Sequence, residues 1–250
     1  MPDEPSVTAT GPPPVLATFE GRECFAAFVA HELRTPLALQ RAVVEAALTD
    51  PRADTAALRA MAADVLASCE QQERLIEALL DLTRSQRGLK CHESVDIAAI
   101  TNNALRAHDL SKLERVLALE PARTTGDPGL VERLAANLVS NAIRHNVTGG
   151  RIEVVTRTEA ERAVLSVANT GPLIPAGEVT RLFQPFVRLG SPPQTGHGGA
   201  GLGLTIVQAI ASAHLAIITA RPRADGGLKI EVSFPATGRS SGTEATIPPR

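Results

Sequence analysis

The stretch Phe25–Leu39, FAAFVAHELRTPLAL, decides how the first half of this chain folds. Each residue of an α-helix turns about 100°, and on that geometry the apolar side chains gather on one broad face. His31 falls near the opposite side, next to Glu32 and one turn before Thr35. Pro36 removes one backbone donor and should kink the helix beyond the histidine. The stretch predicts an amphipathic helix with a solvent-facing imidazole, which by itself could also be an ordinary surface histidine.

A second helix is predicted to follow the first, which should run from about Glu20 to Thr49. The residues at 50–52 break the pattern, and Asp54 or Thr55 can cap the next helix, which should end near Gly88. Two long helices joined by a tight turn form an antiparallel hairpin. Each helix carries an apolar stripe wider than one hairpin can cover. We therefore expect a homodimer through this hairpin, with two copies forming a four-helix bundle.

Composition argues for a globular chain and against nucleic-acid-binding, metal-binding cysteine-rich and membrane-spanning proteins. The apolar fraction of 44% over 250 residues is ample for a buried core, and a net charge of −2 offers no argument for nucleic-acid binding. Three cysteines without metal-like spacing indicate reduced thiols. No apolar run approaches the ~20 residues of a membrane span, and no signal peptide precedes the first helix. We expect a soluble, cytoplasmic chain without a membrane segment.

Beyond Gly88 the pattern becomes that of a mixed α/β domain, so the predicted fold class is α+β. Four regions are expected: a disordered or linker segment at 1–18, the hairpin at 19–90, an α/β sandwich at 91–236 and a disordered tail at 237–250. Within the sandwich, strands are predicted at 94–96, 116–119, 151–158, 163–168, 217–220 and 228–234, with helices to about 107, after GDPG at 126–129 and at 202–214.

Four segments of this second region carry residues suited to nucleotide chemistry. In NLVSNAIRH at 137–145, Asn137 and Asn141 lie four apart on one helical face, where amide oxygens can hold Mg²⁺ together with nucleotide phosphates. VANTGPLIP at 167–175 is a strand that runs into a Gly-Pro turn, and LFQPFVRL at 182–189 contains two phenylalanines. GHGGAGLGL at 196–204 opens a helix, and glycines there allow close approach to phosphates. Each segment alone also fits an ordinary helix face, turn or linker.

Together with HELRTP at 31–36, the four segments give a specific resemblance. HELRTP resembles the phosphoacceptor box of the sensor histidine kinases. The later segments resemble the nucleotide-binding fold shared by histidine kinases, DNA gyrase, heat-shock chaperone 90 and mismatch-repair ATPases. The resemblance covers about residues 20–236 and implies an ATP-binding domain that uses ATP and Mg²⁺. It also implies a response-regulator receiver domain as the partner, and a cytoplasmic chain or the cytoplasmic part of a longer membrane kinase.

The resemblance also implies roles for particular residues. His31 corresponds to the phosphoacceptor, Glu32 to the acceptor of the other ring proton, and Thr35 to the residue that orients water in the reverse, phosphatase reaction. Asn141 corresponds to the metal ligand, assisted by Asn137. The remaining nucleotide contacts implied by the resemblance are His145 near the phosphates, Asn169, Gly171 and Leu173 in the turn, and Gly199, Gly201, Leu202 and Gly203 in the glycine-rich segment.

Two positions, Asn169 and Leu173, depart from the usual histidine-kinase pattern, and a third, Asn137, distinguishes the kinases from the ATP-hydrolysing relatives. Asn169 stands where the histidine kinases usually have the aspartate that accepts a hydrogen bond from adenine, and Leu173 replaces a glycine. An amide that is free to turn offers an acceptor or a donor, so we expect weaker ATP binding than a carboxylate would give and a relaxed preference for ATP over GTP. Asn137 stands where the ATP-hydrolysing relatives carry a glutamate, and an amide is no general base.

The predicted function is therefore an ATP-dependent histidine kinase that phosphorylates His31 and passes the phosphoryl group to an aspartate of a response regulator. Regulator phosphatase activity is expected as well. Two alternatives stay open. The changes at Asn169 and Leu173 favour a degenerate kinase that acts as a nucleotide-binding or scaffold module, and a hydrolytic ATPase is disfavoured by Asn137.

Overall fold

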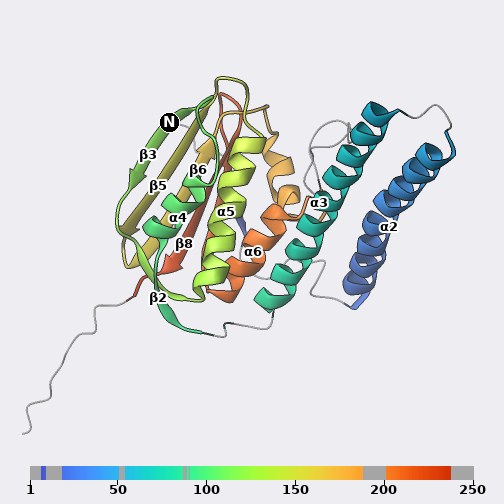
Figure 1. The fold of residues 1–250 in the computed structure, drawn as a ribbon. Coiled ribbons are helices and arrows are strands. Elements are labelled where there is room, and N and C mark those ends of the chain that lie inside the picture. The colour runs from blue at the N-terminus through green and yellow to red at the C-terminus, as the bar shows by residue number, and fades with distance from the viewer. Residues whose placement is uncertain are drawn as a thin grey trace, which may run out of the picture.

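The computed structural model describes residues 7–9, 19–50, 54–86, 89, 91–187 and 201–237 (Figure 1). Two long helices come first, and a mixed α/β domain follows. The helices are α2 (Phe19–Thr49), α3 (Thr55–Gln86), α4 (Ile97–Arg106), α5 (Pro128–Arg144), the 3₁₀ helix η1 (Ala176–Phe183) and α6 (Gly203–Ala213). The strands are β1 (Val7–Ala9), β2 (Glu93–Asp96), β3 (Glu114–Leu119), β4 (Arg123–Gly126), β5 (Arg151–Glu159), β6 (Arg162–Asn169), β7 (Ile217–Pro222) and β8 (Leu228–Pro235).

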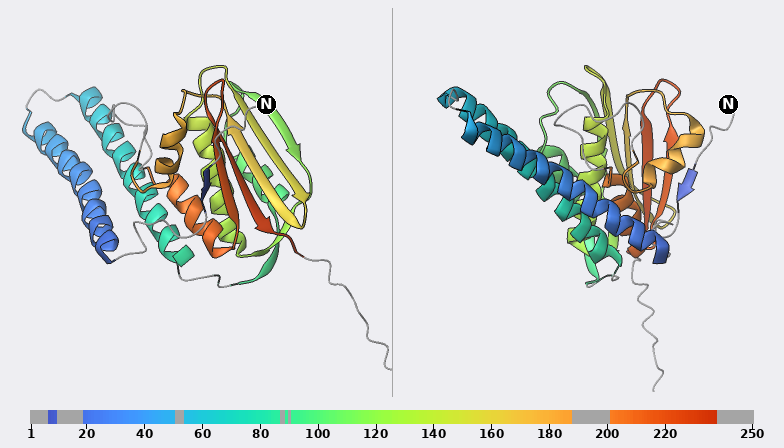
Figure 2. Two further views of the ribbon diagram at one scale, coloured as in Figure 1. Left: turned by 180° about the vertical axis from the view of Figure 1, so that it is seen from behind. Right: turned by 90° about the vertical axis from the view of Figure 1, so that its right-hand side faces the viewer.

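The sheet and helices of the second region form two layers. A six-stranded sheet has the order β1-β7-β8-β6-β5-β3, in which β3 and β5 are parallel and the other neighbours antiparallel. Helices α4, α5 and α6 cover one face of this sheet (Figures 1 and 2). In β6 every side chain after Arg162 is buried, whereas in β8 buried side chains alternate with more exposed ones. The core residues of these two strands include Leu165, Val232 and Phe234. This arrangement confirms the predicted α+β class with a helical hairpin and an α/β sandwich.

Local side chains explain where several helices begin. The Asp54 carboxylate accepts a hydrogen bond from the Ala57 backbone N–H at 2.7 Å and caps α3. Asp96 caps α4 in the same way, and Asp127 caps α5 through the N–H groups of Gly129 and Leu130. These caps satisfy donors that every helix start leaves open. Helix α2 continues through Pro36 as one helical segment of 31 residues.

The hairpin and the sandwich are in direct contact. Helix α3 lies beside α6, and α2 lies on the far side of α3 from the sheet (Figures 1 and 2). Leu75 of α3 is buried, and Ala78 and Leu79 pack against the same apolar cluster that fills the sandwich. The apolar core of the second domain therefore extends onto one face of the hairpin.

Three elements differ from the sequence-based expectation. Residues 7–9, expected to be disordered with the rest of 1–18, form strand β1 and pair with β7, with Val7 opposite Ala220. The 3₁₀ helix η1 lies in a region expected to be loop, and β4 pairs with β2 where no strand was expected. All three are short, and β1 and β4 are held by partners distant in sequence, which a local pattern does not reveal. The predicted tail at 237–250 lies outside the described residues except for Thr237.

Candidate functional site

The candidate phosphoacceptor, His31, is exposed on α2. The Thr35 hydroxyl, one turn further along, donates a hydrogen bond to the His31 backbone oxygen at 3.1 Å. The Thr35 hydroxyl proton is therefore used in a hydrogen bond within α2, while the hydroxyl oxygen can still accept a hydrogen bond. The side chain of Glu32 lies outside the described residues. The exposed imidazole agrees with the helical-periodicity prediction.

The apolar stripes of the hairpin are left open in the single chain. On α2, Leu37 is 53% exposed, Leu39 is 64% exposed and Leu48 is 79% exposed. On α3, Leu66 and Leu80 are also exposed. Scattered exposed leucines are ordinary on a protein surface, but two long helices with such stripes on both members are not. This chain has more apolar hairpin surface than its own fold covers.

Helix α5 presents the first group of predicted nucleotide residues. The Asn137 side-chain N–H donates to the Arg133 backbone oxygen at 2.9 Å, so the acceptor of this amide is its Oδ1 atom. A Cβ atom built on Gly203 would lie 3.4 Å from that Oδ1 atom, so the start of α6 approaches the Asn137 amide closely. Asn141 is half-buried one turn beyond Asn137, and His145 ends the helix. The structure therefore brings the first and fourth predicted segments together.

The turn after β6 holds the Asn169 side chain in one orientation. This residue is only 7% exposed, and its amide N–H donates to the backbone oxygens of Thr170 at 2.7 Å and His145 at 3.4 Å. If the amide were rotated by about 180°, its Oδ1 atom would face the backbone oxygens of Thr170 and His145, and acceptors repel one another. The expectation of an amide free to turn is therefore wrong, because two main-chain acceptors engage its donor. The Oδ1 atom alone is available to a ligand as an acceptor.

Close backbone packing supports the same turn. A Cβ atom on Gly171 would lie 2.6 Å from the His145 backbone oxygen, a distance that no side chain tolerates. Gly227, with φ +96°, passes so near the backbone oxygen of Asn169 that no side chain fits there either. Leu173, in contrast, is 75% exposed and is separate from these contacts. Gly171 is therefore required by the backbone approach between the turn and the end of α5.

The start of α6 is held at the base of the glycine-rich segment. Gly201 has φ +69°, and the Phe186 backbone N–H donates to its oxygen at 2.9 Å. The Thr205 hydroxyl donates to the Phe183 backbone oxygen at 3.1 Å, so the phenylalanine segment and α6 are tied together. Leu202 is buried and occupies the N-cap position of α6 without a side-chain hydrogen bond. The first N–H groups of the helix suit an anion such as phosphate. Gly199 lies within 188–200, outside the described residues.

One buried histidine, His214, was missed from the sequence. Its Nδ1 atom donates to the Ile210 backbone oxygen at 2.8 Å, and its Nε2 atom accepts from the Asp127 backbone N–H at 3.1 Å. This pair of bonds requires the neutral ring, and burial lowers the pKa of His214. The ring ties the end of α6 to the residue that caps α5. Both helices that carry predicted nucleotide residues are therefore joined at this point.

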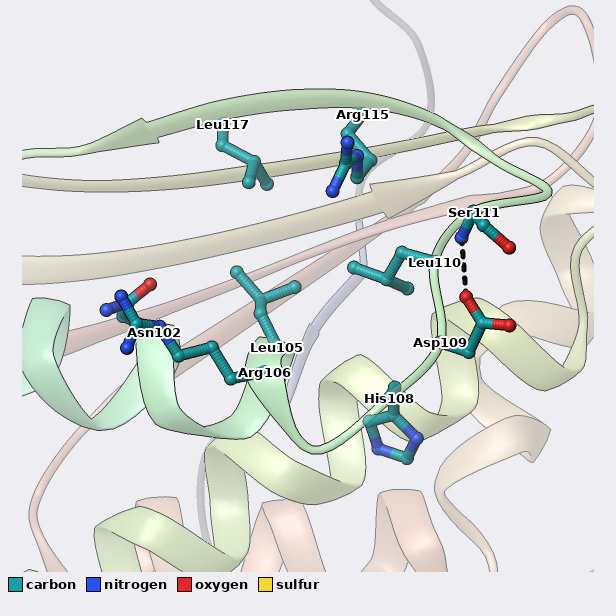
Figure 3. Close-up of a pocket in the computed structure, with 9 residues that line it drawn as sticks. All are labelled: Asn102, Leu105, Arg106, His108, Asp109, Leu110, Ser111, Arg115 and Leu117. Carbon is teal, nitrogen blue, oxygen red and sulfur yellow. Dashed lines mark hydrogen bonds between the residues drawn. The ribbon is translucent and has the colours of Figure 1, made fainter.

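A separate pocket of about 410 Å³ lies between α4 and β3 (Figure 3). Leu105 and Leu110 line its apolar part, Arg115 and Leu117 enter it from β3, and Asp109 is held by the Ser111 N–H. None of the predicted site residues lines it. Within the described parts of the chain, no cluster of three or more histidine, cysteine or acidic side chains could hold a metal ion.

Two family profiles match the chain. Residues 22–88 match the His Kinase A (phospho-acceptor) domain, and residues 126–238 match the histidine kinase-, DNA gyrase B- and HSP90-like ATPase. The first match contains His31, and the second contains the segments around Asn137, Asn169 and Gly203.

Named relatives have both parts in one chain. The chain is 42% identical over 222 residues to the sensor protein CutS of Streptomyces coelicolor, a match over 87% of this chain and 53% of CutS. It is 33% identical over 224 residues to the signal transduction histidine-protein kinase/phosphatase MprB of Mycolicibacterium vanbaalenii, covering 85% of this chain and 43% of MprB. The chain thus spans about half the length of these relatives.

Solved structures share the fold. The histidine kinase AdeS of Acinetobacter baumannii aligns with a TM-score of 0.64 at 23% identity, covering 83% of this chain and 98% of that one. The mycobacterial sensor histidine kinase MprB aligns with a TM-score of 0.52 at 26% identity over 58% of this chain and 97% of that one. Across the described helices, none is long and apolar enough to cross a lipid bilayer.

Proposed function

The chain belongs to the sensor histidine kinases of two-component systems, and from that premise we propose that it transfers the γ-phosphoryl group of ATP to His31. We further propose that the phosphoryl group then passes to an aspartate of a response-regulator receiver domain. The activity would take place in the cytoplasm, where ATP is available. The chain would work there as a soluble kinase or as part of a longer membrane kinase.

One observation supports this proposal most strongly, the convergence of three predicted nucleotide segments in the sandwich. The Asn137 amide meets the start of α6 at Gly203, and the Asn169 turn packs on the His145 end of α5. A nucleotide lying along α5 would have its phosphates near the N-terminus of α6, where the N-cap residue Leu202 makes no side-chain hydrogen bond. Its base would lie towards the buried acceptor Oδ1 of Asn169. The same chain supplies an exposed histidine on α2 as the acceptor.

The proposed chemistry is a substitution at the γ-phosphorus. A neutral ring nitrogen of His31 forms a bond to phosphorus as the bond to the bridging oxygen of ATP breaks, and ADP leaves with that electron pair. A neutral imidazole nitrogen carries a lone pair and is a competent nucleophile. We assign to Glu32 the acceptance of the other ring proton as positive charge develops. Most of the rate enhancement would come from positioning and charge neutralisation.

The residues of α5 fit a magnesium ion bound mainly through phosphate oxygens. The Asn137 side-chain amide donates to the Arg133 backbone oxygen, its Oδ1 atom remains as the acceptor of that amide, and Asn141 follows on the same face. Mg²⁺ accepts amide oxygens and retains several waters, so a cage of carboxylates is unnecessary. When bound, the ion would neutralise charge on the phosphates. We assign Asn141 as its ligand and Asn137 as the assisting residue.

Two further assignments complete the proposal. Thr35 would orient water for dephosphorylation of the regulator, since its oxygen remains a hydrogen-bond acceptor one turn from His31. A homodimer through the hairpin would cover the apolar stripes that the single chain leaves open, including Leu39 and Leu48. The relative MprB is itself named as a kinase and phosphatase.

The test is incubation of the full chain with γ-labelled ATP and Mg²⁺. Protein-bound label should be stable in base and labile in acid, as phosphoramidates are. His31→Gln should abolish the label and leave the far-ultraviolet circular dichroism unchanged, whereas His108→Gln, at another exposed histidine, should retain it. Label that persists in His31→Gln would overturn the assignment of His31. Steady phosphate release from His31→Gln would instead support a hydrolytic ATPase.

A further inference from the structure

The sandwich is joined to α3 by a group of charged residues that are not among the predicted nucleotide residues. Arg133 of α5 places its Nε atom 2.6 Å from an Asp81 carboxylate oxygen and its Nη2 atom 3.2 Å from a Glu77 oxygen. The Asp81 side chain is only 5% exposed, and Arg84 approaches its other oxygen at 3.8 Å. Arg133 therefore bridges two acidic residues of the hairpin, one of them nearly buried.

A buried carboxylate of this kind depends on its partner. Burial raises the pKa of Asp81, and the Arg133 guanidinium opposes that rise. Both charges regain water if the sandwich leaves α3, which offsets part of the attraction within the pair. The pair does define how the sandwich sits on α3, because a carboxylate that stays buried without its cation is strongly unfavourable. The pair thus has the character of a switchable contact.

The packing around the pair also suits a contact that opens. Gln72 Nε2 on α3 and Gln208 Oε1 on α6 are buried without hydrogen-bond partners among the residues that the structure describes. Gln72 lies on the α3 face that carries Leu75 and Leu79, three and seven residues further along. Buried amide groups without partners weaken a docked interface. On the α3 side, the described contacts with the sandwich include Leu75 and Leu79 and the charged group around Arg133.

Arg133 is also linked to the predicted nucleotide site. Its backbone oxygen accepts the hydrogen bond from the Asn137 side chain, one helical turn along α5. In this arrangement the sandwich packs on α3, and α2 with His31 lies beyond α3 (Figures 1 and 2). Transfer needs the reacting atoms about 3 Å apart. Helix α3 therefore lies between the sandwich and the helix that carries the proposed phosphoacceptor of the same chain.

We propose that the Arg133–Asp81–Glu77 group is an ionic latch that holds the nucleotide-binding domain on α3 and away from the kinase step. The inference rests on the proposed kinase function, because its consequence is a change in the rate of phosphorylation. Opening the latch is then a step that an input can control.

The test compares three variants of the full chain with the wild type. Asp81→Asn removes the buried charge at constant shape. The exchange variant Asp81→Arg/Arg133→Asp restores a pair of opposite charges. Glu45→Gln is the matched control, because it removes an exposed ion pair with Arg41 that has the same 2.6 Å separation. Initial rates of His31 labelling are measured at saturating ATP.

Asp81→Asn should label His31 roughly fivefold faster or more, the lower end of typical coupling between sites. The exchange variant should return towards the wild-type rate, and Glu45→Gln should match the wild type. An unchanged or slower rate in Asp81→Asn would overturn the latch. A slower rate would show that the pair assembles the kinase arrangement instead.

A second measurement keeps the latch testable if no variant is labelled. Spin labels at Glu73→Cys on α3 and Lys112→Cys in the sandwich, both exposed positions, report the distance between the two parts in a background without the native cysteines. Dilution with unlabelled chains keeps one labelled chain per dimer. Asp81→Asn should broaden this distance distribution towards longer values, and Glu45→Gln should leave it unchanged. An unaltered distribution in Asp81→Asn would refute the latch, whereas absent labelling of wild type refutes the kinase proposal alone.

Discussion

The substitution Asn169→Asp tests how this chain recognises its nucleotide. A carboxylate is what the resemblance leads one to expect at this position, and a free carboxylate would accept the adenine amine with charge assistance. In this structure the amide N–H of Asn169 donates to the backbone oxygens of Thr170 at 2.7 Å and His145 at 3.4 Å. Aspartate has no donor for either oxygen. We therefore expect Asn169→Asp to weaken ATP binding.

The magnitude follows from the burial of this contact. The side chain is 7% exposed, so water compensates poorly for the lost donor. Leaving a buried polar group without its partner costs about 1–3 kcal/mol, and the carboxylate faces two carbonyl oxygens as well. The ionised side chain would rotate away and move the acceptor out of place. A loss of about 1.4 kcal/mol corresponds to roughly tenfold weaker ATP binding.

Competitive displacement of a fluorescent ATP analogue, by ATP and then by GTP, measures this effect. Wild type should prefer ATP because only the acceptor Oδ1 faces the base, whereas the keto oxygen of guanine is itself an acceptor. Asn103→Asp, at an exposed position of α4, is the control for the added negative charge. Tighter ATP binding by Asn169→Asp would refute the reasoning, since it would mean that the amide is not held by the two carbonyl oxygens.

Four other outcomes are expected. Thr35→Ala should lose regulator phosphatase activity and keep most autophosphorylation, and equal loss of both would make Thr35 structural. Gly171→Ala places a Cβ atom 2.6 Å from the His145 backbone oxygen, so the free energy of unfolding should fall by about 1–3 kcal/mol. The thermal midpoint and the nucleotide affinity should fall with it, and an unchanged midpoint in a thermal shift assay would contradict this. The pKa of His214 lies below its ordinary value of 6.5, so the unfolded state binds more protons in acid. Its contribution to the free energy of unfolding is complete above pH 6.5 and is lost as the pH falls towards and through the lowered pKa, and His214→Gln should flatten that slope in urea titrations. Residues 19–90 alone should sediment as a dimer, and a monomer of native helicity would contradict the proposed interface.

Much of the fold follows from local sequence. The helices of the hairpin are specified by apolar residues at three- and four-residue steps, and Asp54 and Asp127 specify where α3 and α5 begin. The exposure of His31 also follows from helical periodicity alone. These features depend on neighbours within one turn of the backbone, so a single stretch of chain contains the information that determines them.

Tertiary structure decided the details of the site. The Asn169 amide is oriented by the His145 oxygen, 24 residues earlier, and Asp127 is bonded to His214, 87 residues later. Arg133 reaches Glu77 across 56 residues and joins the two domains. Strand β1 pairs at the far edge of the sheet although its own sequence indicates a linker. In each case the partner is brought near only by the folded backbone. Residue type therefore states which hydrogen bonds and ion pairs are available, and the fold determines which of them form.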